Sequence, residues 1–183
     1  MDRINVRKIA FSGVVAALYA GLTMAVMPLS YGPVQLRLSE ALCIMPFFFP
    51  FTVWGLFVGC IVANLISPYP LDILVGPIAS FIAALCTMYI GKMKKRESIS
   101  IKTLACFPPV LFNALFIGAM IAYIMVGEGA ADAFLPAFIS SGLWVGLGQL
   151  IVMYALGLPL MIFLPKTKLI NRLTKLYIRG DGQ

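Results

Sequence analysis

The chain alternates long apolar stretches with short polar or basic segments. The apolar stretches cover residues 9–27, 38–66, 73–90, 104–126 and 134–164. A membrane-spanning helix needs about 20 apolar residues, so each stretch approaches or exceeds the length of one crossing. We expect all regular structure to be helical, because helices satisfy the backbone hydrogen bonds of a spanning chain inside lipid. The stretch 38–66 contains Pro46 and Pro50, which raises the question of one helix or two.

The basic residues decide between these two possibilities. All but one of the 14 Lys and Arg residues fall into three segments, 3–8, 92–102 and 166–179. Cytoplasmic loops carry the excess of Lys and Arg, so all three segments should lie on the cytoplasmic side. An even number of crossings must then separate them, which requires a split near Pro50. We therefore predict an all-α membrane protein, a six-transmembrane-helix bundle in one domain over 1–183 with both termini cytoplasmic, and approximate spans 9–27, 38–49, 51–66, 73–91, 103–126 and 134–164.

Two segments of this prediction have special features. The span 38–49 would cover only about 18 Å at 1.5 Å per residue. Short or proline-interrupted membrane helices often border a cavity. The segment 166–179 has leucines and cations at helical spacing, which favours an amphipathic helix on the inner membrane surface. The first apolar run is expected to be a retained helix of the plasma-membrane protein rather than a signal peptide.

Composition agrees with a membrane protein and excludes several functions. Of 183 residues 61% are hydrophobic and 11% charged, with a mean hydropathy of +0.98. Soluble domains are about half apolar and a quarter charged. The net charge of +7 would suggest nucleic acid in a soluble protein, but here the cations lie between apolar spans, so no nucleic-acid partner is expected.

Few residue types for catalysis or metal binding are present. The absence of histidine removes histidine zinc sites and Ser-His-Asp triads. The four cysteines are scattered singly in apolar stretches and are expected to be small buried hydrophobes. No nucleotide-binding glycine pattern occurs, so ATP energy would come from another chain. We expect no enzyme activity, metal or cofactor.

Charged residues near the second span are the first candidates for ligand binding. Arg37 and Glu40 lie three residues apart, so one helical turn would bring them together. Ser39 and Glu40 could instead cap the start of this helix. Arg37 could instead extend to the outer interface, where it is the sole predicted cation.

Other polar residues fall inside or beside spans. Asn64, Asn113 and Gln149 could contact a ligand or could hydrogen-bond between helices. Asn113 follows Pro108-Pro109, which should break or kink the helix. Asp72 could bind ligand or act as a helix N-cap. Aromatic side chains could stack on a flat ligand or anchor at the interface. The expected substrate-binding set is Tyr31, Gln35, Arg37, Glu40, Asn64, Asp72, Asn113, Trp144 and Gln149.

Small residues form a smooth face on the first helix. Gly13, Ala17 and Gly21 recur every four residues, as do Ala16 and Ala20. Such faces let another helix approach closely. This face could pack inside the bundle, or it could be a partner-docking surface made by Gly13, Ala16, Ala17 and Ala20.

The segment 32–42, Gly-Pro-Val-Gln-Leu-Arg-Leu-Ser-Glu-Ala-Leu, resembles the QueT family. Six helices, about 180 residues and an Ala-xxx-Ala first helix resemble the substrate-binding (S) component of an energy-coupling factor (ECF) transporter. The resemblance implies capture of a queuosine precursor, a 7-deazaguanine base, beneath an outer loop near 28–37. It also implies association with an ECF transmembrane coupling protein and two ATPase subunits, with Ala16 and Ala20 on the docking face. The alternatives are an S component for another vitamin, a stand-alone secondary transporter and, least favoured, an intramembrane enzyme.

Overall fold

The computed structural model describes residues 3–32 and 35–167, and these residues form helices and connecting turns without a β-strand. The all-helical class is therefore confirmed for this part of the chain. The predicted amphipathic segment 166–179 lies almost wholly outside the described residues.

Four helical segments are long and apolar enough to cross a membrane, namely Val6–Ala25, Asp72–Gly91, Ile99–Gly127 and Phe134–Lys166. Two shorter apolar segments, Leu38–Phe48 and Thr52–Asn64, complete the bundle. Large apolar side chains such as Trp54, Leu74 and Leu143 are exposed on its outside. An exposed apolar surface of this kind fits a lipid environment.

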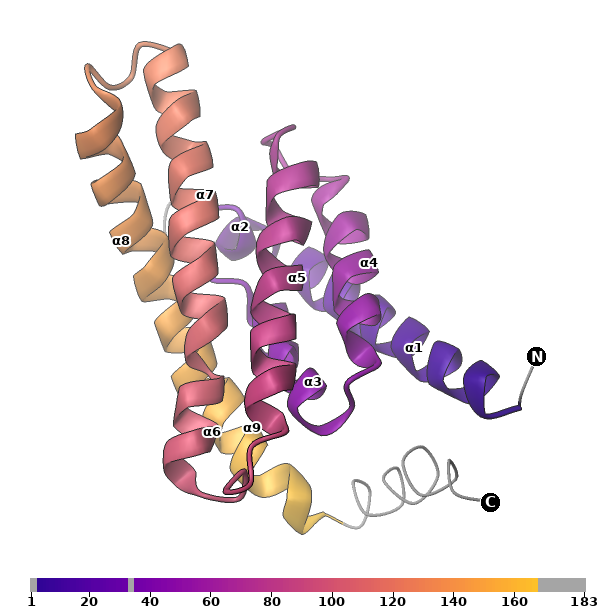
Figure 1. Cartoon of the computed structure of the whole chain (residues 1–183). Helices are drawn as coiled ribbons and strands as arrows, with labels where there is room; N and C mark the ends of the chain where they lie inside the picture. The colour runs from indigo at the N-terminus through magenta and orange to yellow at the C-terminus, as the bar shows by residue number, and fades with distance from the viewer. Residues whose placement is uncertain (1–2, 33–34, 168–183) are drawn as a thin grey trace.

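The N-terminal half is built from α1 (Arg3–Ala25), the short α2 (Met27–Ser30), the 3-10 helix η1 (Leu38–Ile44), α3 (Met45–Phe48), α4 (Thr52–Asn64) and α5 (Asp72–Gly91). The chain turns back between α3 and α4, so 38–66 is not one continuous helix (Figure 1). Pro50 lies in this turn, and Thr52 Oγ1 donates to the Phe49 carbonyl at 2.7 Å. Because proline lacks an N–H and clashes with the preceding helical turn, it favours the break here.

The C-terminal half is a long hairpin of helices. It contains α6 (Ile99–Ala105), α7 (Phe107–Gly127), α8 (Phe134–Val152), the π-helical segment η2 (Met153–Gly157), α9 (Leu158–Phe163) and η3 (Leu164–Lys166). The helix breaks at Cys106, directly before the turn that holds Pro108 and Pro109. The prolines then occupy the first turn of α7, where a missing N–H costs no hydrogen bond.

Tight packing joins α1 to α4. A Cβ on Gly59 would lie 2.8 Å from the Ala16 carbonyl oxygen and 3.0 Å from Cβ of Tyr19. Only glycine permits this approach of the two helices. The contact belongs to a core that includes Val15, Leu56 and Ala84 and that joins α1, α4 and α5.

The described parts of the basic segments gather at one end of the molecule. The start of α1, the α5–α6 connection and η3 all lie at the lower end in Figure 1. Lys8 and Lys92 line the same hollow there. The described parts of the basic segments therefore lie at one end, and their placement on the cytoplasmic side stays a prediction.

Candidate binding site

Glu40 lies at the centre of the most polar part of the interior. It belongs to η1 and is only 1% exposed. Its Oε1 accepts hydrogen bonds from the Tyr19 hydroxyl and from Ser80 Oγ at 3.5 Å, and its Oε2 accepts from Cys43 Sγ at 3.1 Å. No cation pairs with this carboxylate among the described residues. Burying a charge is costly unless it is paired or well hydrogen-bonded, so a ligand that donates to Glu40 would gain much from the contact.

Arg37 pairs with Asp72 and not with Glu40. Arg37 Nη2 contacts Asp72 Oδ2, its Nε donates to the Ser30 carbonyl at 3.2 Å, and its guanidinium lies 5.0 Å from the centre of the Tyr31 ring. Both partners of the ion pair are buried. The expected contact between Arg37 and Glu40 is therefore wrong, because η1 begins after Arg37 and leaves its side chain free to reach the start of α5. The alternative in which Arg37 extends to the outer interface is wrong for the same reason.

Glu40 and Asp72 both lie in the first turn of their helices, where an acid favours the positive helix end, but neither helix has a side-chain cap hydrogen bond. Ser67 Oγ donates to Asp72 Oδ2 at 3.1 Å. The Ser39 hydroxyl instead shares a hydrogen bond of 2.6 Å with Thr23 Oγ1 of α1. Both acids thus use their carboxylates for contacts between elements.

Asn64 joins the end of α4 to the start of α5. Its Nδ2 donates to the Asp72 carbonyl at 2.8 Å. A Cβ on Gly76 would lie 2.3 Å from Asn64 Nδ2 and 2.8 Å from Asp72 Oδ1. The glycine therefore makes the room in which these two polar side chains meet.

The segment before η1 is fixed against the bundle. The Tyr31 hydroxyl donates to the Ala63 carbonyl at 2.6 Å, and Ser30 Oγ donates to the Thr23 carbonyl at 3.0 Å. Gln35 is buried and has a φ of +45°, a conformation that is uncommon for residues other than glycine. Backbone strain of this kind persists where the surrounding structure imposes it, and here it directs an amide side chain inward.

Five buried polar atoms have no hydrogen-bond partner among the described residues. All five belong to residues of the expected substrate-binding set, namely Gln35 Nε2, Asn64 Oδ1, Asp72 Oδ1, Asn113 Nδ2 and Gln149 Oε1. An unsatisfied buried group costs about 1–3 kcal/mol. The cost would be recovered if a polar ligand supplied the missing partners.

Asn113 and Gln149 each lie one turn from a member of the same apolar cluster on the α7–α8 hairpin. Asn113 is one turn from Val110 and Gln149 one turn from Met153, and both of these apolar residues pack in one cluster with Ile44 of η1. Residues three or four apart share a helix face, so both amides face the interior. Glu40 likewise precedes Ile44 of η1 by about one turn, so each of the three polar residues is about one turn from a member of this apolar cluster.

Trp144 is placed differently from the rest of the expected set. It is 52% exposed and lines a shallow hollow on the outside of α8 with Ile139, Ser140, Leu143 and Leu147. It does not join the buried polar side chains.

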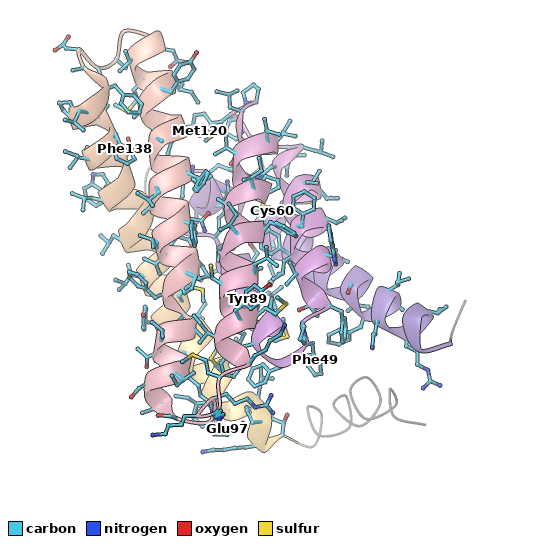
Figure 2. All side chains as sticks on the ribbon, viewed as in Figure 1. Phe49, Cys60, Tyr89, Glu97, Met120 and Phe138 are labelled. Atoms are coloured by element: carbon cyan, nitrogen blue, oxygen red, sulfur yellow. The ribbon has the colours of Figure 1, made fainter. Side chains whose placement is uncertain are left out.

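Sequence reasoning missed several residues of this site. Tyr19, Cys43 and Ser80 donate to Glu40, and Gly76 makes room for the amide of Asn64. Tyr19 and Ser80 are polar side chains inside apolar spans, and this placement could have identified them as candidates from the sequence. Cys60, labelled in Figure 2, lies near the same cluster, with its Sγ 3.6 Å from the Tyr19 hydroxyl.

The small-residue face of α1 divides into two parts. Ala16 contacts Gly59 of α4 and Ala20 is only 6% exposed, so this stripe packs within the bundle. Gly13 and Ala17 are exposed, and a Cβ on Gly13 would meet no atom within 4 Å. One part of the face therefore packs inside the bundle, and the other part is exposed and could contact a partner. Docking to a partner stays a prediction.

Long apolar helices around a buried group of charged and amide side chains fit a multi-pass membrane protein. The chain belongs to the QueT transporter family, whose sequence model matches residues 9–166. One relative, the queuosine precursor transporter QueT of Lactococcus lactis subsp. cremoris (strain MG1363), is 33% identical over 84 residues. The match covers 45% of this chain and 50% of that relative, so it spans about half of the relative's length. No solved structure matches the chain.

Proposed function

We propose that this chain is the substrate-binding component of an energy-coupling factor transporter and captures a queuosine precursor, a 7-deazaguanine base, from outside the cell. Membership of the QueT transporter family and the name of the Lactococcus relative support the substrate class. The observation that carries the proposal is the buried Glu40 carboxylate, which has no cation partner among the described residues, together with the buried amide and carboxylate atoms that lack hydrogen-bond partners there.

The chemistry of these atoms suits a 7-deazaguanine. The unpaired oxygens of Asn64, Asp72 and Gln149, together with Glu40, accept hydrogen bonds from the N–H groups along the base edge. The unpaired Nδ2 of Asn113 and Nε2 of Gln35 donate to its carbonyl and ring acceptors. A site built to hydrogen-bond a substrate rejects analogues that lack those groups, so we expect selective binding.

Aromatic stacking is better supplied by Tyr31 than by Trp144. Tyr31 is buried beside the Arg37–Asp72 ion pair, whereas Trp144 is half exposed on the outer surface of α8. A role for Trp144 in binding would require it to leave that surface.

The proposed arrangement in the membrane has six crossings with both termini in the cytoplasm. The gathering of the described basic segments at one end supports it, since Lys and Arg concentrate on the cytoplasmic side. An ECF coupling protein and two ATPase subunits would supply the energy, and we propose that the coupling protein docks beside Gly13 and Ala17.

The test is ligand binding to the purified chain without partners. A 7-deazaguanine base is titrated by calorimetry, with guanine, riboflavin and thiamine as controls. Saturable binding of the deazaguanine with 1:1 stoichiometry, and none of the vitamins, is expected. Binding of a vitamin in its place would assign the chain to another micronutrient, and absence of binding to all four compounds would overturn the proposal.

A stand-alone secondary transporter is the second candidate, because Glu40 is a buried acid that could carry a proton. Proteoliposomes that contain only this chain distinguish the two. The S-component proposal expects uptake only after the partner subunits and ATP are added. Uptake driven by a pH gradient in their absence would favour the second candidate.

A further inference from the structure

A second hollow lies at the basic end of the molecule, apart from the candidate binding site. Its volume is about 830 Å³. This volume is within the range of about 300–1,000 Å³ that small-molecule sites occupy. The hollow lies between the start of α1, the α3–α4 turn and the α5–α6 connection, where Figure 2 labels Phe49 and Glu97.

The hollow exists because α3 is short and α5 is long. α3 ends at Phe48 and the chain turns back through Pro50, whereas α5 continues to Gly91 and its connection extends past Arg96. A Cβ on Gly91 would lie 2.6 Å from the Phe47 carbonyl oxygen, so the end of α5 packs directly against the backbone of α3. The space beyond this contact is left between α1 and the α5–α6 connection.

The lining of the hollow has an apolar wall and a basic rim. The wall is formed by Phe47, Phe48, Pro50, Phe51, Met88 and Met93. The rim carries four cations, Lys8, Lys92, Lys94 and Arg96, and one acid, Glu97. The lining thus has more positive than negative charge.

The acid neutralises only part of the rim, because one rim cation, Arg96, pairs with it. Glu97 is held by Lys102, whose Nζ lies 3.2 Å from Oε2, and by Arg96, whose Nε lies 3.6 Å from Oε1. Lys92 Nζ lies 5.0 Å from the centre of the Tyr89 ring, a contact that leaves its charge available. Lys94 has no ion-pair partner among the described residues.

We propose that this hollow binds the phosphate headgroup of an anionic glycerophospholipid. The basic rim attracts the phosphate, and the apolar wall receives the first methylenes of the acyl chains. Basic pockets between membrane helices on the cytoplasmic side are suited to such headgroups. A zwitterionic lipid of the same size gains less, because its choline cation opposes the rim.

Native mass spectrometry of the full chain in neutral detergent tests this assignment. The probes are dioleoyl phosphatidylglycerol, dioleoyl phosphatidylcholine and inorganic phosphate. We expect one phosphatidylglycerol to be retained at least tenfold more strongly than phosphatidylcholine. Equal retention of the two lipids would overturn the proposal, as would displacement of phosphatidylglycerol by millimolar inorganic phosphate, since the site would then prefer the free anion.

Matched variants locate the bound lipid. Lys92 and Lys166 each place Nζ over an aromatic ring, at 5.0 Å from Tyr89 and 5.6 Å from Phe163, but only Lys92 lines the hollow. We expect Lys92→Gln to lower the preference for phosphatidylglycerol several-fold and Lys166→Gln, which removes the same charge, to keep it, with helical content by circular dichroism unchanged in both. If both variants lost the preference for phosphatidylglycerol equally, net charge alone would retain the lipid, and the proposed lipid site would be wrong.

Discussion

The Tyr19 hydroxyl of α1 donates a hydrogen bond to Oε1 of Glu40, 21 residues further along the chain in η1. Both side chains are buried. The same helix carries the exposed Gly13 and Ala17 on another face. One rigid element therefore joins the candidate binding site to the proposed docking surface, which is a physical route by which a bound ligand could influence partner association.

Replacing Glu40 by Gln should weaken ligand binding without loss of the fold. Gln retains the size and one acceptor oxygen but removes the charge. Because hydrogen bonds to charged groups contribute about 1.5–3 kcal/mol, we expect the Kd for the 7-deazaguanine to rise at least about tenfold. Calorimetry measures the change, with Glu128→Gln as control because Glu128 is an exposed acid. An unchanged Kd in Glu40→Gln would remove Glu40 from the site.

Asn113→Leu should separate binding from stability. The substitution removes the buried Nδ2 that has no partner, so the Tm of the ligand-free protein should stay the same or rise while affinity falls. Thr87→Val is the contrasting control, since Thr87 Oγ1 is buried and donates to the Ala105 carbonyl at 3.1 Å. That variant should lower the Tm and keep the affinity. Thermal unfolding with and without ligand measures both effects, and a large loss of Tm in Asn113→Leu would indicate a structural role.

Gly76→Ala should damage the polar contact between α4 and α5. Alanine normally stabilises a helix relative to glycine by about 0.5–1 kcal/mol. Here the new Cβ would lie 2.3 Å from Asn64 Nδ2, and overpacking typically costs about 1–3 kcal/mol. We expect a lower Tm and weaker ligand binding. Gly21→Ala, where the Cβ meets nothing within 4 Å, should leave both unchanged or raise the Tm; equal behaviour of the two variants would contradict this account.

The Arg37–Asp72 ion pair should show strong coupling. Removal of one partner of a buried pair leaves an uncompensated charge and costs about 3–5 kcal/mol. We expect Arg37→Leu and Asp72→Leu each to lower the Tm more than the double variant does. Thermal unfolding of all three variants measures the coupling, and additive losses would show that the two charges act independently.

Ala17→Trp should block transport and spare binding. Ala17 is exposed on α1, so a large side chain there leaves the α1–α4 contact at Gly59 intact while it obstructs a docking helix. Leu143→Trp, at an exposed position of α8, is the control for bulk on the outer surface. Ligand binding by the purified chain and ATP-dependent uptake by the assembled transporter are measured in parallel. Normal uptake in Ala17→Trp would place the docking surface elsewhere.

The sequence by itself determined the helical class and the chemistry that the interior could hold. Apolar runs of spanning length admit only helices in lipid, and Pro50 with the three basic segments indicated the break between α3 and α4. Polar residues in apolar spans are costly, so polar residues inside or close beside the spans are conspicuous in a sequence. The residues that stand out for this reason are all buried, namely Gln35, Arg37, Glu40, Asn64, Asp72, Asn113 and Gln149.

Only the tertiary structure decided which of these residues meet. Local spacing suggested Arg37 with Glu40, but Arg37 pairs with Asp72, 35 residues away, and Glu40 receives its donors from α1, η1 and α5. Spacing along one helix is a local property, whereas these contacts depend on how separate helices pack. The tertiary structure likewise decided that Trp144 is exposed and that Ala20 is buried. Packing, and not residue type, sets which side of a helix faces lipid and which side faces a neighbouring helix.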